Sequence, residues 1–196
     1  MTTIAASYTP AGAIFDNKTI CNIAYHPHEN KIVSGLSNGA LSLWHLLMGH
    51  TELKAHKKAV SAVTFSPCGK YFATGSDDTY VHFWDTDEKK KLCKSLCFNS
   101  PIKSIAYNND GTCISAVTAN IIGTYNSDQL VHKQTISTDS NIISCSYLTE
   151  NTYLICTQTG EILKYDLRSQ EPAEIIKTNL PITSAATRGA ENQCAV

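Results

Sequence analysis

One short pattern of apolar and polar positions recurs along the chain at an almost constant interval. An apolar residue is followed, after two other residues, by a second apolar residue and, two positions later, by an aromatic residue. The pattern occupies residues 20–25, 60–65, 102–107 and 142–147, with a degenerate fifth copy at 182–187. The last positions of these five copies are 40, 42, 40 and 40 residues apart. A second set of aromatic residues keeps a similar interval: Trp44, Trp84, Tyr125 and Tyr165. Two independent anchors therefore predict a structural repeat of about 40 residues.

The second copy shows how one repeat divides into strands. Four short runs alternate apolar and polar residues or are rich in β-branched and aromatic residues: AVSAVTF, YFATGS, YVHFWD and LCKSLC. The turn-forming segments SPCGK, DD and TDEKKK separate them. In the first copy, Asn38-Gly39 is a strong signal for a tight hairpin. Four strands in about 40 residues are typical of one β-propeller blade. A β-sandwich is the alternative, but it does not require a fixed period.

The predicted fold class is therefore all-β: a β-propeller of four-stranded antiparallel blades, with about four complete blades and part of a fifth. The whole chain, residues 1–196, forms a single partial propeller in this interpretation, with blades at about 17–55, 56–98, 99–138 and 139–178 and an incomplete blade at 179–196. Such a ring is not closed, and residues 3–15 could supply no more than one outer strand. We consider three explanations: a fragment of a longer protein, which we favour; completion by a partner or a second copy; or a small irregular propeller of four blades.

The second repeat resembles a blade of the WD-repeat (WD40-type) β-propeller family. The resemblance rests on His56, on the segments VSAVTFSPCGK and ATGSDD, and on the closing Trp84-Asp85. It implies a structural hydrogen-bond tetrad formed by His56, Thr74, Asp78 and Trp84. In such a tetrad the hydroxyl would accept the buried indole N–H. The Asp carboxylate would orient the imidazole and raise its pKa.

Only the second repeat has all four tetrad residues, so the others are expected to rely on apolar packing between sheets. At the His and hydroxyl positions stand Asp16 and Ser34 in the first repeat, Phe98 and Ala116 in the third, and Thr138 and Cys156 in the fourth. Gly49-His50 resembles a Gly-His dipeptide of the family, but it lies six residues too far from Trp84. We expect this dipeptide in a loop of the first repeat.

Composition and charge disfavour several classes of function. Lys and Arg number 16 and Asp and Glu 17, so no overall basic field would draw the chain to nucleic acid or to an anionic membrane. No run of 18 apolar residues could span a membrane, and the N-terminus has no signal-peptide pattern. Eight scattered cysteines in a chain of ordinary composition are typical of reduced thiols. We expect an intracellular protein, in the cytoplasm or the nucleus.

Motifs that would indicate catalysis or a bound cofactor are missing from the sequence. We find no G-x-S-x-G elbow, phosphate loop, H-E-x-x-H or G-x-G-x-x-G. Residues 26–29, His-Pro-His-Glu, are interpreted as a polar turn rather than a metal site, because a third ligand is lacking. His82 is expected to face a neighbouring strand or solvent. We therefore expect no enzyme activity, no catalytic residue, no metal and no cofactor.

A rigid propeller without catalytic groups predicts a non-catalytic scaffold or adaptor subunit of a larger intracellular complex. Its protein partners would bind loops on the top face. The candidate contact residues on this rim are Lys57, Lys58, Asp77, Ser37 and Asn38. Direct nucleic-acid contact and membrane insertion are not expected. The ring could be completed by missing C-terminal sequence or by another chain.

Another hypothesis is a substrate receptor of a cullin-type ubiquitin ligase. Tyr165-Asp166-Leu167-Arg168 resembles the W-D-x-R tetrapeptide with which such receptors dock on their adaptor, which makes Arg168 a candidate partner-binding residue. Further alternatives are a subunit of a ribosome-assembly or RNA-processing complex, or of a trafficking or ciliary-transport complex. The repeats themselves do not separate these subfamilies.

Overall fold

The computed structural model describes residues 18–45, 49–169, 171–178, 180–182, 186–188 and 193–195, the last two ranges as backbone only. All regular elements in these ranges are β-strands, which confirms the predicted all-β class. None of them is a helix that is long and apolar enough to cross a membrane. Asp16 and the proposed closing segment 3–15 lie outside the described residues.

Sixteen of the strands form four antiparallel sheets, each built from four strands that follow one another in the chain. The first sheet contains β1 (Ile20–Tyr25), β2 (Lys31–Leu36), β3 (Ala40–His45) and β4 (Gly49–Lys54). The second contains β5 (Val60–Phe65), β6 (Tyr71–Ser76), β7 (Tyr80–Asp85) and β8 (Lys90–Cys97). The third contains β9 (Ser104–Tyr107), β10 (Cys113–Val117), β11 (Ile121–Asn126) and β12 (His132–Ser137). The fourth contains β13 (Ile142–Tyr147), β14 (Thr152–Thr157), β15 (Glu161–Asp166) and β16 (Glu174–Lys177).

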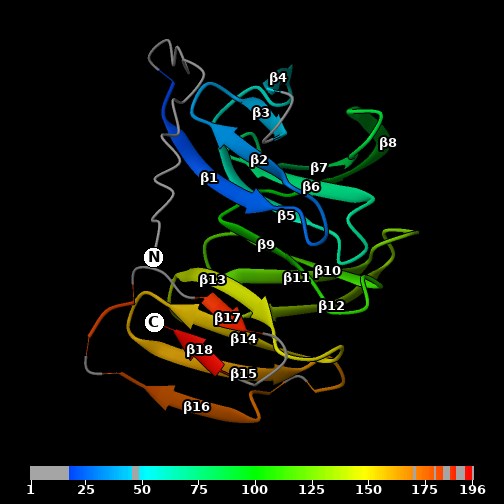
Figure 1. Ribbon diagram of the computed structural model, residues 1–196. Helices are drawn as coiled ribbons and strands as arrows, with labels where there is room; N and C mark the ends of the chain where they lie inside the picture. Colours follow the sequence, from blue (N-terminus) through cyan, green and yellow to red (C-terminus); the bar gives the residue numbers. More distant parts are fainter. Residues whose placement is uncertain are drawn as a thin grey trace, which may run out of the picture.

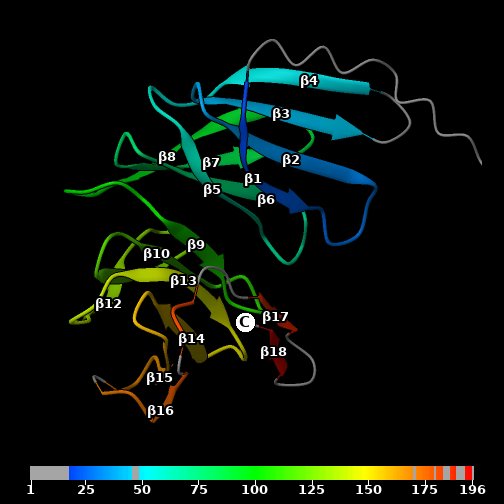
Figure 2. The same ribbon diagram turned by 90° about the vertical axis from the view of Figure 1, so that its left-hand side faces the viewer.

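Two short strands, β17 (Ala186–Arg188) and β18 (Gln193–Ala195), pair with each other and begin a fifth unit beside β13. The first strands of successive sheets contact one another, β1 against β5, β5 against β9 and β9 against β13. Figures 1 and 2 show the resulting arrangement, in which the sheets follow one another from β1–β4 at the top to β13–β16 at the bottom. Blade-like sheets thus surround a common axis, and the described sheets leave this ring open.

A bulge in the first strand of a sheet explains the apolar spacing seen in the sequence. Val60 and Val63 are three residues apart, which in a regular strand would place them on opposite faces. The register of β5 against β6 shifts between Val60 and Ala62, and both valines are buried. The same shift occurs at the equivalent positions of β1 and β13. The pattern therefore marks a bulged inner strand in the first, second and fourth sheets. In the third sheet Ile102 precedes β9, and β9 pairs with β10 in regular register.

Apolar side chains fill the space between neighbouring sheets. One cluster joins the first and second sheets and includes Leu41, Val60 and Trp84, and comparable clusters join the second to the third and the third to the fourth. The second and third sheets approach each other so closely at Gly75 of β6 that a side chain does not fit. A Cβ atom there would lie 2.5 Å from Cγ2 of Ile102. The core is thus distributed between sheets rather than gathered in one centre.

Two predictions about local structure were wrong. Gly49-His50 is not in a loop: it begins β4, where His50 pairs with Trp44 and stacks on its ring. Cys156 does not occupy the position equivalent to Thr74. Thr74 pairs with His82, which lies two residues before the aromatic anchor Trp84. In the fourth sheet the residue two positions before the anchor Tyr165 is Leu163, and it pairs with Ile155. Both errors arose because pairing register, rather than spacing alone, sets these positions.

Candidate functional site

Four side chains of the second sheet form one directional chain of hydrogen bonds. Trp84 Nε1–H donates to Thr74 Oγ1 at 3.0 Å, and the Thr74 hydroxyl donates to His56 Nε2 at 2.8 Å. His56 Nδ1–H then donates to the carboxylate of Asp78 at 3.0–3.1 Å. His56, Thr74 and Trp84 are all buried, so these contacts satisfy groups that water does not reach. The network ties the start of β5 to β6, to the following turn and to β7.

The carboxylate at the end of this chain also holds the loop backbone. Asp78 accepts the N–H groups of Lys57 at 2.9 Å and Tyr80 at 3.1 Å. Burial alone would raise the pKa of Asp78, but these two N–H groups and His56 outweigh it and lower the pKa. Asp78 is therefore an anion at neutral pH that fixes both the segment before β5 and the turn after β6.

The pKa of His56 moves in the opposite direction from our expectation. Burial lowers the pKa of the imidazole, and the attraction of Asp78, which acts in the other direction, does not compensate for it. The nearby Lys91 ammonium lowers it further. His56 is thus neutral at pH 7, the state in which Nε2 can accept the proton of Thr74. The sequence predicted the partner of the imidazole, but the burial that decides its charge comes from the surrounding sheets.

His82 is a buried residue whose surroundings the sequence did not indicate. Its ring lies parallel to the His56 ring, with centroids 4.5 Å apart and an interplanar angle of 12°. Lys91 Nζ donates to His82 Nε2 at 2.9 Å, while Nδ1 is buried without a hydrogen-bond partner among the described residues. Burial, together with His56 and Lys91, lowers the pKa of His82 to about 4. His82 is therefore neutral and packs as a flat ring that supports the tetrad.

The five rim candidates lie on two neighbouring turns and on the segment between them. Ser37 and Asn38 occupy the turn between β2 and β3, and Asp77 the corresponding turn between β6 and β7. The backbone of Lys57 and Lys58 runs between these turns: His56 N–H donates to the Gly39 carbonyl, and Asp77 N–H donates to the Ala59 carbonyl. The side chains of Ser37, Asn38, Lys57 and Lys58 are exposed and that of Asp77 is half-buried.

Arg168 lies apart from this rim, at the opposite end of the sheets. It follows β15, in the turn that leads to β16, and its guanidinium is exposed. Arg168 Nε and Nη2 donate to the two carboxylate oxygens of Asp166 at 2.8 and 2.7 Å. This bidentate pair lowers the pKa of Asp166 to about 2 and holds the guanidinium in one orientation over the turn.

Other contacts join the sheets that lack a tetrad. Ser115 of β10 bonds the Thr124 hydroxyl at 2.8 Å and the Tyr147 hydroxyl of the next sheet at 2.6 Å. In the first sheet, the Ser34 hydroxyl donates to the Ser42 carbonyl at 3.3 Å. In the third sheet, hydroxyl groups thus form the buried hydrogen bonds between strands that the tetrad forms in the second sheet.

Polar turns at the end of the sheets opposite the rim connect neighbouring blades. His26 is buried: its Nδ1 accepts the N–H of Glu29, so Nε2–H donates to the Gly69 carbonyl of the second sheet at 3.0 Å. Asn108 Nδ2 likewise donates to the Glu150 carbonyl of the fourth sheet at 3.0 Å. The 26–29 segment is therefore a link between blades. Among the described residues, no group of three or more His, Cys, Asp or Glu side chains could hold a metal ion.

A protein-family model matches the part of the chain that carries the tetrad. The family model "WD domain, G-beta repeat" matches residues 49–85. This range contains β4 of the first sheet and β5 to β7 of the second, so the sequence repeat and the sheet are offset by one strand. The match includes His56, Thr74, Asp78 and Trp84.

Two curated proteins show similarity over longer segments. "DDB1- and CUL4-associated factor 13" of Dictyostelium discoideum is 24% identical over 172 residues, which cover 80% of this chain and 38% of that protein. "Apoptotic protease-activating factor 1" of Mus musculus is 32% identical over 81 residues, which cover 40% of this chain and 6% of that protein. The chain thus spans well under half of either relative. Residues 49–85 thus match a WD repeat, and the repeated four-stranded antiparallel sheets are consistent with the blades of a β-propeller.

Proposed function

We propose that this chain is a non-catalytic protein-interaction adaptor whose partner binds the rim formed by Ser37, Asn38, Lys57, Lys58 and Asp77. The support is the contrast between backbone and side chains at this rim. Asp78 and the tetrad hold the backbone of residues 56–58, whereas the lysine side chains of Lys57 and Lys58 are exposed. A fixed backbone that presents free polar side chains lowers the entropy lost on binding.

Charge reversal at the rim tests this proposal. The double variant Lys57→Glu/Lys58→Glu should lose the proteins that co-purify with the tagged chain from cells. The matched control is Lys90→Glu, which reverses an exposed charge on β8, away from the rim. Equal recovery of every partner by the double variant and the wild-type chain would contradict a role for this rim.

A more specific role is that of a substrate receptor of a cullin-type ubiquitin ligase. Two observations support it: the exposed Arg168 in the Tyr165–Arg168 tetrapeptide, and the similarity to a relative whose name states association with DDB1 and CUL4. In this proposal the guanidinium, oriented by Asp166, contacts the adaptor subunit. The rim at the opposite end of the sheets remains available for the substrate.

Direct binding of purified DDB1 separates this role from general adaptor function. Arg168→Ala should abolish a binding signal that Lys177→Ala, an exposed residue on the same sheet, retains. Asp166→Asn should weaken binding less, because it releases the guanidinium without removing it. If DDB1 does not bind the wild-type chain, or binds Arg168→Ala equally well, the receptor role is wrong while the adaptor proposal stands.

A further inference from the structure

A lysine ammonium and a cysteine sulfur of the third sheet lie in direct contact, apart from both the tetrad and the rim. Lys133 Nζ donates to Cys113 Sγ at 2.9 Å. Cys113 is the first residue of β10 and Lys133 the second residue of β12, and β11 lies between these two strands (Figure 1). The contact therefore joins two strands whose backbones do not pair with each other.

A bulge in β12 explains why the lysine side chain points back across the sheet. The register of β12 against β11 shifts between Thr124 and Tyr125, and Lys133 is the residue left without a partner on β11. In a regular strand, Lys133 and Gln134 would face opposite sides of the sheet. The bulge changes this alternation: Gln134 bonds a tyrosine hydroxyl of the fourth sheet at 3.2 Å, while Lys133 reaches Cys113.

The sulfur lies in the joint between the third and fourth sheets, directly beneath an exposed side chain. Cys113 faces the fourth sheet, because Ser115, two residues later on β10, bonds the Tyr147 hydroxyl of that sheet. Cys113 is 1% exposed, whereas Lys133, which contacts the sulfur, is exposed. Exposed side chains change rotamer within nanoseconds, so movement of this lysine opens a path from solvent to the sulfur.

Lys133 is the reactive partner that the surroundings offer to this sulfur. In the described part of the chain, the hydrogen-bond contacts of the sulfur are the Lys133 ammonium and the Thr112 hydroxyl, which is 3.7 Å away. The cysteines described are all free, and within the same ranges Lys133 forms no ion pair with a carboxylate. An oxidised cysteine in the sulfenic acid state condenses with a thiol or with a nitrogen. The nitrogen of Lys133 already lies against the sulfur.

We propose that Cys113 and Lys133 are a modification site at which a peroxide induces a covalent S–N cross-link. The peroxide transfers one oxygen atom to the thiol, so the sulfur is oxidised to a sulfenic acid and the peroxide is reduced to water. The Lys133 amine, after losing its ammonium proton to solvent, attacks the sulfur. The S–N bond forms, the S–O bond breaks, and the hydroxyl leaves as water with one amine proton. Two molecules of a small thiol reverse the reaction: they restore thiol and amine and become a disulfide.

Mass spectrometry of the full chain after treatment with hydrogen peroxide tests this proposal. The remaining thiols are alkylated, and the chain is then cleaved with trypsin, which cuts after lysine and arginine. The unmodified chain gives the peptide 104–133, which ends at Lys133. A cross-linked Lys133 resists trypsin, so the peptide 104–164 should appear instead. It should be lighter by two hydrogen atoms and carry no alkyl group on Cys113.

Three variants identify the groups that react. Lys133→Arg keeps the positive charge but replaces the amine by a guanidinium that stays protonated, and Cys113→Ser removes the sulfur. Both should lose the cross-link completely, whereas Cys93→Ser, the matched control at an exposed position of β8, should retain it. In Lys133→Arg the sulfenic acid should persist and become labelled by dimedone. Lys133→Arg changes an exposed side chain, so the test stays valid if Cys113→Ser does not fold.

Two results would overturn the proposal. One is normal cleavage after Lys133 in the oxidised chain, whether Cys113 is unmodified or has become a sulfinic acid. The other is a Cys113 thiol that stays fully alkylatable at peroxide concentrations that oxidise the exposed Cys93. Either result would leave the adaptor function intact, because the rim and Arg168 take no part in this chemistry.

Discussion

Replacing the Thr74 hydroxyl by a methyl group tests whether the tetrad stabilises the second sheet. In Thr74→Val the side chain keeps its shape, but Trp84 Nε1–H loses its acceptor and His56 Nε2 loses its donor. Thr74 is 0% exposed, and His56 and Trp84 are 4% and 3% exposed, so water cannot replace the hydroxyl. Each of the two buried groups left unsatisfied costs about 1–3 kcal/mol, so the free energy of unfolding should fall by about 2–6 kcal/mol.

Urea unfolding followed by tryptophan fluorescence measures this change directly, because Trp84 is one of only two tryptophans in the chain. The matched control is Thr74→Ser, which keeps the hydroxyl and loses one methyl group, at a cost of about 1 kcal/mol. If both variants unfold within about 0.5 kcal/mol of each other, the hydrogen bonds add nothing to packing and the reasoning fails.

Three further predictions concern the same sheet. His82→Phe should flatten the loss of stability at acid pH. Because the folded pKa of about 4 lies below the ordinary 6.5, the protein is fully stabilised above pH 6.5 and loses stability as pH falls toward 4. At pH 5 the variant should lose about 1–2 kcal/mol less than the wild type, and an unchanged pH profile of urea midpoints would contradict this. Thr79→Gly should raise the free energy of unfolding by up to about 1 kcal/mol, because the β-branched Thr79 is held at φ 76°. The equivalent position of the first sheet is a glycine, Gly39. A melting temperature below that of the wild type would contradict this prediction. Gly75→Val should lower the free energy of unfolding by about 1–3 kcal/mol or more, because its Cβ would meet Ile102, and a wild-type urea midpoint would show that the sheets can separate there.

The repeat was predictable because its signals are local. Inner strands, hairpin turns and the closing Trp84 each follow from short stretches of sequence, and their fixed interval gives the number of sheets. The resemblance to the family likewise pointed to the partners of His56, since it places Thr74 on β6 and Asp78 in the turn that follows. The pairing register was less predictable: the bulge near Val60 and the pairing of Ile155 with Leu163 depend on how two strands align.

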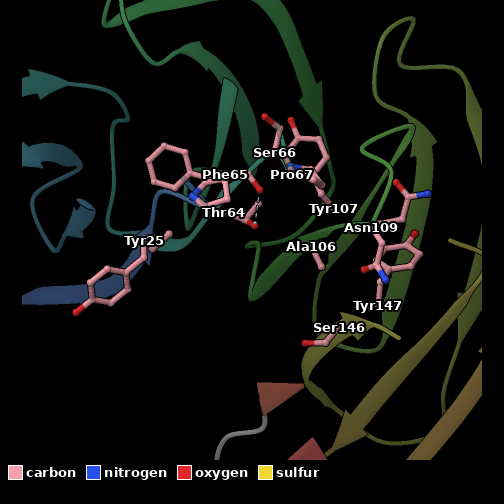
Figure 3. Close-up of a pocket in the computed structure, with 13 residues that line it drawn as sticks. Tyr25, Thr64, Phe65, Ser66, Pro67, Ala106, Tyr107, Asn109, Ser146 and Tyr147 are labelled. Atoms are coloured by element: carbon pink, nitrogen blue, oxygen red, sulfur yellow. Dashed lines mark hydrogen bonds between the residues drawn. The ribbon is translucent and has the colours of Figure 1, made fainter. Parts of the chain in front are cut away.

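Contacts between repeats were outside the reach of the sequence. His26 and Asn108 occupy unremarkable polar turns, yet each bonds a carbonyl of the next sheet, 43 and 42 residues away in the chain. No local pattern encodes such a contact, because it requires the two sheets to be docked. A cavity at the end of the sheets opposite the rim (Figure 3) is of the same kind, since the residues that line it come from four repeats.

The sequence by itself determined the all-β class and the repeat of about 40 residues, because both the alternation within strands and the interval between copies can be read along the chain. The residues of the tetrad followed from the resemblance of the second repeat to a known family. Only the tertiary structure decided the charge state of His56 and His82. Both rings carry basic nitrogens and lie near ionic groups, but the neighbouring strands remove water, and the cost of desolvating a cation then outweighs the attraction of Asp78. Burial of this kind is a property of the packed sheets, and no residue carries it alone.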